Sequence, residues 1–558
     1  MRRVIYVIVA SLLLVSCENE SALDIEVENT PTCLNEELNL TDGVMIGEKL
    51  RNPYSIEVMK QACDLLYPPT RGEDPVSDSI IVPNVKYVRF LPMDSVEYRL
   101  LMDSDLELFN YPLDYDILGD PSDYHDPNLP PEQITWQYTV MPIEQTPPIN
   151  RVELLGTGYV PDIGSSSLHD LSAIERLAND LVLNELITDR TDGTPPPPPP
   201  TSSLTSHTGK IRLCDTGGGS AKGVKGVKVR ARHFFKIRTA YTDEDGSYNI
   251  NMRDFDGVNP RFELRFENRY GFKLGYNVEL IMPQTYNMWS TRSHTFEDSD
   301  TGKDYKAWVL CTINNAAYDW YERCEKEGMP KPPSDLYLWA MEMGRGASCM
   351  MLHHGTLEES KDDLLTMWGY QTDERGLSDI LELLSAIVDL IGPDITVCNV
   401  DQLKTEDLYR STSHELAHAT HFQQVGASNQ ERARWWSDVI NYEATCIVLS
   451  SGAKTYEYLG LPYEERAGIA EMWAYAVGYI MLYEYLGNKM YAYPVTDKYW
   501  FKPTVVWNLY KAGLSLKDIS DSMSDTIITL QAFKEQLIED NEQYKATINS
   551  IFSTYLSM

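Results

Sequence analysis

The spacing of apolar residues changes along the chain, and its last part has the spacing of helices. Apolar positions there recur every three to four residues, which places them on one face of a helix. An apolar, β-prone run at 393–398 predicts one strand among these helices. The predicted helices are 308–327, 377–390, 405–424, 464–485, 505–512, 516–522 and 530–555. We therefore expect a mostly helical domain over residues 286–558.

The region 209–285 has the period of two that is typical of strands. Phe262, Leu264 and Phe266 alternate with charged residues, which predicts a half-buried strand. The run TDEDGSY at 242–248 predicts a hairpin turn that leads into another strand. We expect a small all-β domain here.

The region 32–190 mixes the two patterns and predicts an α+β region with no recognisable chemistry. Strands are predicted at 86–91, 135–141 and 152–155, and helices at 55–66 and 167–187. Six consecutive prolines at 195–200 then predict a semi-rigid polyproline II linker over 191–208. The chain as a whole is expected to be multidomain.

The first residues predict export. Arg2 and Arg3 precede an apolar run over 4–15, which is too short to span a membrane but suits a secretory signal. The run ends in Leu-Val-Ser-Cys and resembles a bacterial lipobox, in which Cys17 becomes the lipidated N-terminus. The resemblance implies a signal peptide over 1–17, a polar tether over 18–31 and attachment to a membrane through lipid. We expect a cell-envelope lipoprotein of the outer membrane or the cell surface, with the periplasmic side left open.

The composition of the chain excludes some classes of binding partner. The net charge is −35, from 83 acidic and 48 basic residues, and such a surface argues against nucleic acid and anionic lipid as partners. The nine cysteines contain no C-x-x-C pair, so a cysteine zinc site is not expected. Disulfides and free buried thiols both stay open for the cysteines beyond Cys17.

The chemistry concentrates in one motif, HELAH at 414–418. Positions four apart lie on one face of a helix, so His414 and His418 present two imidazoles side by side, as a zinc ion requires. Glu415 stands next to them, where a carboxylate can activate a metal-bound water. Gln424 occupies the position of the third metzincin histidine, which excludes that class. His421 is expected to pack beside the ligands.

A third ligand is required, and two glutamates are candidates. Glu471 is favoured, because a carboxylate in the centre of an apolar helix is costly unless it is paired or metal-bound. Glu443, in another apolar segment, is the alternative. Tyr475 and Tyr479 follow Glu471 at helical spacing and are candidate oxyanion donors, although packed aromatics explain them as well.

Two further patterns carry resemblances. The sequence Glu471-Met-Trp-Ala resembles the second helix of glutamate-zincins (gluzincins), and GVKGVKVRAR…TAYTDEDGSYNI resembles the carboxypeptidase regulatory-like domain, a transthyretin-like β-sandwich. Together with the lipobox and HELAH, they resemble a group of Bacteroidetes-type lipoprotein zinc metallopeptidases. The resemblance implies a zincin-like catalytic domain with one Zn²⁺ per chain, held by His414, His418 and Glu471. It also implies that the strand at 393–398 is an edge strand that holds extended peptide.

The expected function is therefore zinc-dependent hydrolysis of peptide bonds in extracellular or periplasmic proteins by a zinc-activated water. One alternative is a cell-surface binding or adhesion lipoprotein with a degenerate zincin domain. A second is a structural zinc site that only stabilises a helical scaffold. The substrate, its cleavage specificity and the oligomeric state are left open by the sequence.

Overall fold

A computed structural model describes residues 45–556, apart from gaps that fall mainly in loops. The gaps are 70–71, 73, 94, 119–123, 131–132, 162–168, 189–207, 252–254, 256–257, 278–282, 343–345, 357–392, 450–457 and 488–497. The predicted signal peptide with Cys17, the tether, nearly all of the linker and the predicted helix 377–390 lie outside the described residues.

The N-terminal region contains both sheets and helices, as its mixed pattern predicts. Its elements are β1 (Met45–Lys49), α2 (Ile56–Leu66), α3 (Val76–Ile80), β2 (Val85–Phe90), α4 (Ser95–Met102), β3 (Tyr115–Leu118), β4 (Gln137–Pro142), β5 (Val152–Gly158) and α5 (Leu171–Thr188). Strands β4, β2 and β5 form an antiparallel sheet in that order, and β1 pairs with β3. Helices α2 and α5 share an apolar core that includes Val58, Cys63 and Ile174.

The middle region is built of strands. They are β6 (Thr208–Leu213), β7 (Lys222–Gly223), β8 (Val227–His233), β9 (Lys236–Tyr241), β10 (Ser247–Asn249), β11 (Arg261–Asn268), β12 (Lys273–Tyr276), β13 (Thr285–Trp289) and β14 (Ser293–Phe296). A four-stranded sheet has the order β10-β6-β14, with β7 paired to β6. Ile211 and Leu213 of this sheet share one core with Val229 and Leu264 of a second, larger sheet.

The larger sheet crosses the predicted domain boundary at residue 285. It has eight strands in the order β16-β17-β15-β12-β11-β8-β9, with β13 paired to β11. Its last members are β15 (Tyr337–Met341), β16 (Ala347–Cys349) and β17 (Ile395–Cys398). Strand β12 pairs in parallel with β15, so strands on both sides of residue 285 belong to one sheet. The separate transthyretin-like sandwich stays a prediction.

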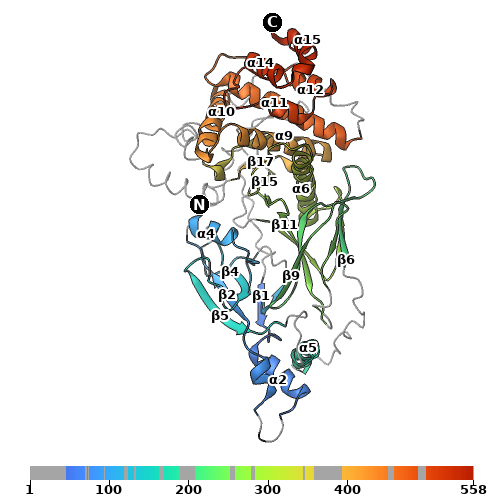
Figure 1. Cartoon of the computed structure of the whole chain (residues 1–558). Coiled ribbons are helices and arrows are strands. Elements are labelled where there is room, and N and C mark those ends of the chain that lie inside the picture. Colours follow the sequence, from blue (N-terminus) through green and yellow to red (C-terminus); the bar gives the residue numbers. More distant parts are fainter. Residues whose placement is uncertain are drawn as a thin grey trace, which may run out of the picture.

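The C-terminal region is helical, and the helices that follow β17 gather at one end of the molecule, beyond β15 and β17 (Figure 1). Its helices are α6 (Gly302–Glu327), α9 (Thr405–Gln424), α10 (Asn429–Leu449), α11 (Glu464–Tyr485), α12 (Thr504–Lys511), α13 (Leu516–Ser520), α14 (Leu530–Asp540) and α15 (Lys545–Leu556). The fold is thus mixed, with several sheets in the N-terminal and middle regions and a helical C-terminal region. No helix in the described part of the chain is both long enough and apolar enough to cross a membrane.

Two local predictions were wrong. The single helix predicted over 530–555 is two helices, because the chain leaves helical geometry at Asn541 and Phe552 of α15 folds back onto Phe533 of α14. The strand at 393–398 does form as β17, but it is not an edge strand. It lies between β15 and β16, and β16 forms that edge of the sheet.

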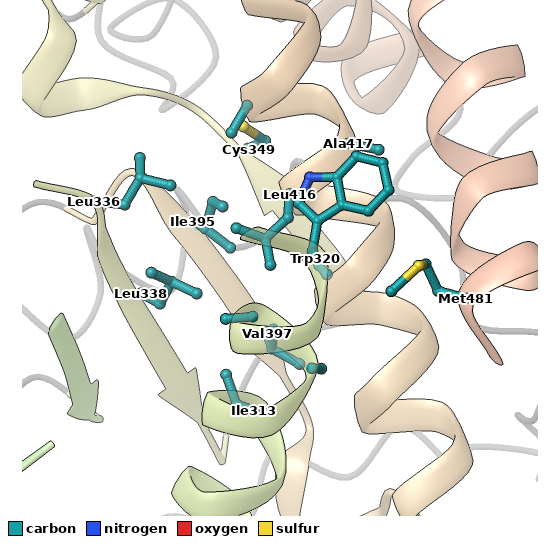
Figure 2. Close-up of a cluster of buried hydrophobic side chains, with 14 of the residues drawn as sticks. Ile313, Trp320, Leu336, Leu338, Cys349, Ile395, Val397, Leu416, Ala417 and Met481 are labelled. Atoms are coloured by element: carbon teal, nitrogen blue, oxygen red, sulfur yellow. The ribbon is translucent and has the colours of Figure 1, made fainter. Parts of the chain in front are cut away.

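The core beneath the helices positions α9. Figure 2 shows side chains of α6, α9 and α11 gathered against the sheet, where Leu416 of α9 lies among residues of α6 and β17. Leu416 and Ala417 are fully buried. These two central residues of HELAH thereby fix the rotation of α9 about its own axis. The residues labelled in Figure 2 are Ile313, Trp320, Leu336, Leu338, Cys349, Ile395, Val397, Leu416, Ala417 and Met481.

Candidate metal centre

Helix α9 is held at its start and along its length. At its first residue, Thr405 N donates to Thr216 Oγ1 over 2.9 Å, and Thr216 N donates back to Thr405 Oγ1 over 2.8 Å. These bonds satisfy a backbone donor that the start of a helix otherwise leaves exposed. Further along, Trp320 of α6 donates its indole N–H to Thr420 Oγ1 over 2.9 Å. The helix is therefore fixed in both axial position and rotation.

Because Leu416 and Ala417 face the core, His414 and His418 face the helices on the other side. The His418 ring lies 5.6 Å from the Trp436 ring of α10, centroid to centroid. The His414 ring lies 6.0 Å from the Tyr475 ring of α11. The two imidazoles thus meet the helices that carry Glu443 and Glu471.

Helix α11 approaches α9 closely because of one glycine. A Cβ at Gly478 would lie 2.9 Å from the carbonyl oxygen of Arg410 and 3.2 Å from Cβ of His414. Trp473 of α11 also donates its indole N–H to the carbonyl of Ala417 over 3.1 Å. The close contact and the hydrogen bond together set the depth at which residues of α11 reach α9.

Four polar atoms converge between the two helices. His414 Nε2 and His418 Nε2 are 3.1 Å apart. Glu471 places Oε2 3.5 Å from His414 Nε2 and Oε1 3.3 Å from His418 Nε2. All three side chains are at least nine-tenths buried.

The spacing of these atoms suits a metal ion. Ligands about 2.0–2.1 Å from a tetrahedral ion, as for zinc with nitrogen and oxygen donors, lie about 3.3 Å from one another. The separations of 3.1, 3.3 and 3.5 Å scatter about that value. His414, His418 and Glu471 therefore fit a metal ion as three ligands.

Glu415 lies beside the three residues and is almost completely buried. Its Oε1 is 3.8 Å from His414 Nε2. His414, Glu415 and His418 each offer a ligand atom, and these atoms all lie within 4.8 Å of one another. A carboxylate at this distance can exchange a proton with a group held by the other three side chains.

Both candidate tyrosines lie on α11, and the ring of one of them packs against a histidine of the site. Tyr475 is in contact with His414, and its hydroxyl donates to the Tyr499 hydroxyl over 2.7 Å. Burial first, and then the neighbouring Tyr479 and Tyr499, raise the pKa of Tyr475 far above its ordinary value, so this phenol stays protonated. Tyr479 is buried one turn further on, beneath the guanidinium of Arg410. Tyr475 is thus the tyrosine placed next to the site.

The other candidates are Glu443 and His421. Glu443 is half-buried on α10, and the carboxylate of Glu471 lies within 3.5 Å of both histidines. The His421 ring packs 5.1 Å from Trp435 and 6.0 Å from Trp436. Burial, with a smaller effect of His418, lowers the pKa of His421 to about 3, so its ring is neutral.

Sequence reasoning missed residues that support the site. Gly478 permits the approach of α11, and a glycine inside a predicted helix was a usable signal of close packing. Trp436 donates its indole N–H to the carbonyl of Cys349 over 2.9 Å, which ties α10 to the edge strand β16. No local pattern marks Trp436, because its partner lies 87 positions away.

Comparison with known proteins adds no assignment. No protein-family model matches the chain, and no curated protein matches its sequence significantly. The site is therefore interpreted from its own geometry.

Proposed function

We propose that this chain is a zinc-dependent peptidase of the glutamate-zincin kind. The observation that carries the proposal is the convergence of His414 Nε2, His418 Nε2 and Glu471 carboxylate oxygens at 3.1–3.5 Å, with Glu415 beside them. Two histidines, a glutamate and an adjacent glutamate base form the donor set of known zinc peptidases. Three protein ligands are typical of catalytic zinc sites, whereas structural sites use four.

Zinc in this position would polarise a substrate carbonyl and make water a nucleophile near neutral pH. Glu415 accepts the proton of the attacking water and delivers it to the leaving amine. Leu416 and Ala417 keep the surroundings of Glu415 apolar, so this proton exchange takes place away from bulk water. The ring of Tyr475 lies against His414 and its hydroxyl stays protonated; that hydroxyl donates to Tyr499, and turning it to a substrate oxygen would stabilise negative charge there.

The substrate class and the location rest on sequence resemblances. The substrate is a protein or peptide outside the cytoplasm, and the chain is a lipoprotein attached through Cys17. Among the described strands, β16 is the edge strand at this end of the sheet, and it lies close to the site, because the carbonyl of its Cys349 accepts a hydrogen bond from Trp436, which packs on His418. We therefore assign to β16 the peptide-binding role that the sequence suggested for 393–398.

The metal content of the purified full chain tests the proposal directly. Elemental mass spectrometry should find one zinc per chain in the wild type. Glu471→Ala should lose most of the zinc, because one of three ligands is removed, and Glu443→Ala should keep it. No zinc in the wild type, even after zinc is supplied, would contradict the proposal. Loss of zinc in Glu443→Ala but not in Glu471→Ala would show that Glu443, and not Glu471, is the third ligand.

A further inference from the structure

A cavity with a mostly apolar lining and two arginines lies away from the metal centre, between the N-terminal region and the large sheet. Its volume is about 210 Å³. Leu50, Leu113 and Tyr115 of the N-terminal region line it, together with Arg232 and Arg261 of the sheet and Phe234 of the turn between β8 and β9. It is smaller than the roughly 300–1,000 Å³ of pockets for drug-sized ligands, so its occupant would be small.

The cavity carries two positive charges, Arg232 and Arg261, that no carboxylate of the described residues pairs with directly. Arg232 donates Nη1 to the backbone carbonyls of Leu113 and Phe234, over 3.2 and 3.3 Å. Its Nε is buried and has no hydrogen-bond partner in the part of the chain that the structure describes. Among the described residues, neither Arg232 nor Arg261 has a carboxylate within ion-pair distance, although neighbouring Arg230 is paired with Glu263 at 2.7 Å.

The two guanidinium groups also act on each other. Burial first, and then the charge of Arg232, lower the pKa of Arg261, while the more distant Asp116 and Glu263 act in the opposite direction. Arg232 is buried and Arg261, its neighbour across the two strands, is half-buried, and placing two like charges side by side in this way is costly unless an anion lies between them. In a chain with a net charge of −35, such a pair is a local exception.

The other walls of the cavity are apolar or neutral. Leu50, Leu113 and Phe234 contribute hydrocarbon and aromatic surface. His233, also in the lining, is kept neutral because burial, and then Arg232, lower its pKa to about 3. Phe234 adopts a positive φ of 46°, a strained conformation for a bulky residue, in the turn between β8 and β9. The lining thus combines a cationic end with an apolar body.

We propose that this cavity binds a small organic carboxylate, with its two oxygens between Arg232 and Arg261 and its apolar or aromatic body against Leu50, Leu113 and Phe234. Guanidinium groups bind carboxylates through paired, charge-assisted hydrogen bonds, which suits a planar two-oxygen anion. The carboxylate comes either from a free acid or from the C-terminus of a peptide. The site is independent of the proposed peptidase activity.

Isothermal titration calorimetry on the purified full chain tests the proposal. Phenylacetate should bind and its neutral isostere phenylacetamide should not, because only the former offers an anion to the two arginines. A dipeptide ending in phenylalanine, compared with its C-terminal amide, distinguishes the peptide source from the free acid. Inorganic phosphate is the remaining probe, and binding of phosphate without phenylacetate would overturn the proposal.

Variants locate the binding. Arg261→Gln should lower the affinity for phenylacetate about tenfold or more, because a charge-assisted hydrogen bond is lost. Arg261 is the informative position, since Arg232 also holds two backbone carbonyls and its loss can impair folding. Arg212→Gln, the same change at an exposed residue of β6, should bind as the wild type does. Absence of phenylacetate binding to the wild type would overturn the proposal. Undiminished binding to Arg261→Gln would also overturn it, because phenylacetate would then bind elsewhere, for example at the metal centre.

Discussion

Two regions of this protein bury ionisable side chains, and they do so in opposite ways. In the large sheet, each of two buried cations faces a carboxylate: Arg230 pairs with Glu263 at 2.7 Å, and Lys236 with Glu175 at 2.7 Å. All four side chains are more than nine-tenths buried. Within these two pairs donors meet acceptors, so their charges are neutralised within the chain.

Between α9 and α11 the arrangement is different. The facing atoms of His414, His418 and Glu471 are nitrogen and oxygen atoms that can each bear a lone pair. They lie 3.1–3.5 Å apart. Convergent lone pairs are favourable when a cation lies among them. The comparison teaches that burial of charge alone does not mark a functional site. The difference lies in whether the buried groups complete one another or leave a place for a ligand.

The largest effect is expected on catalysis. Glu415→Gln should reduce peptide hydrolysis by about 10²–10⁴-fold, the contribution typical of a general base, while zinc content stays at the wild-type level. Glu539→Gln, an exposed residue of α14, is the matched control and should change neither quantity. Hydrolysis of a fluorogenic peptide library and elemental analysis measure the two readouts. Full activity in Glu415→Gln would rule out the proposed mechanism.

Breaking a completed pair should reduce stability and leave the metal in place. Glu263→Ala removes the closer of the two carboxylates of the buried Arg230, leaving Glu107 at 3.6 Å, and should cost about 3 kcal/mol of unfolding free energy. Glu153→Ala removes the half-exposed partner of Arg89 and should cost about 1 kcal/mol or less. Denaturant unfolding compares the two variants. Equal costs would show that the buried network does not hold the sheet together as argued.

The approach of α11 to α9 offers a finer test. Gly478→Ala should cost about 1–3 kcal/mol and weaken zinc binding about tenfold, because the added Cβ meets backbone and Cβ atoms of α9 that cannot move aside. Gly468→Ala, on the same helix, meets the ring of Trp500 instead of α9. It should also reduce stability, by about 1–3 kcal/mol, but leave zinc binding unchanged. Unfolding and competition with a zinc indicator give both quantities, and tight zinc binding in Gly478→Ala would contradict the role of this contact.

His354 is a buried histidine that is paired with carboxylates, and its surroundings predict that the stability of the fold depends on pH. Its ring nitrogens lie 3.0 Å from Asp394 and 3.3 Å from Asp335. Burial alone would lower the pKa of His354, but the two carboxylates outweigh burial and raise the pKa from 6.5 to about 10. The folded chain therefore holds this proton more tightly than the unfolded chain. The resulting stability is fully present below about pH 6.5 and is lost as the pH rises toward about 10.

Replacing His354 should remove this part of the pH dependence. Between pH 6.5 and pH 10, the wild type should lose about 1–2 kcal/mol more unfolding free energy than His354→Gln, a modest value because Asp335 is largely exposed. Denaturant unfolding at several pH values measures the difference. His294→Gln on β14 is the control and should follow the wild-type curve. Parallel curves for wild type and His354→Gln would contradict the raised pKa.

Much of the helical framework could be predicted from the sequence. The predicted helices 405–424 and 464–485 are confirmed as α9 and α11 with the same bounds. Helical periodicity is a local property, because hydrogen bonds within a helix join residues four apart and the apolar face follows from the order of the residues. For the same reason, the sequence alone placed His414 and His418 on one face, with Glu415 beside them.

Only the tertiary structure decided which elements meet. From the sequence, Glu471 and Glu443 were both open as partners of the histidines; the contact at Gly478 and the bond from Trp473 to Ala417 bring Glu471 to 3.3 and 3.5 Å from them. Two other features also depend on segments far apart in the chain. They are the pairing that makes β16 the edge strand in place of β17, and the cavity lined by Arg232 and Arg261. Such contacts depend on how whole elements pack. The free energy of packing is distributed over many residues, so the spacing of a few residues in the sequence does not reveal it.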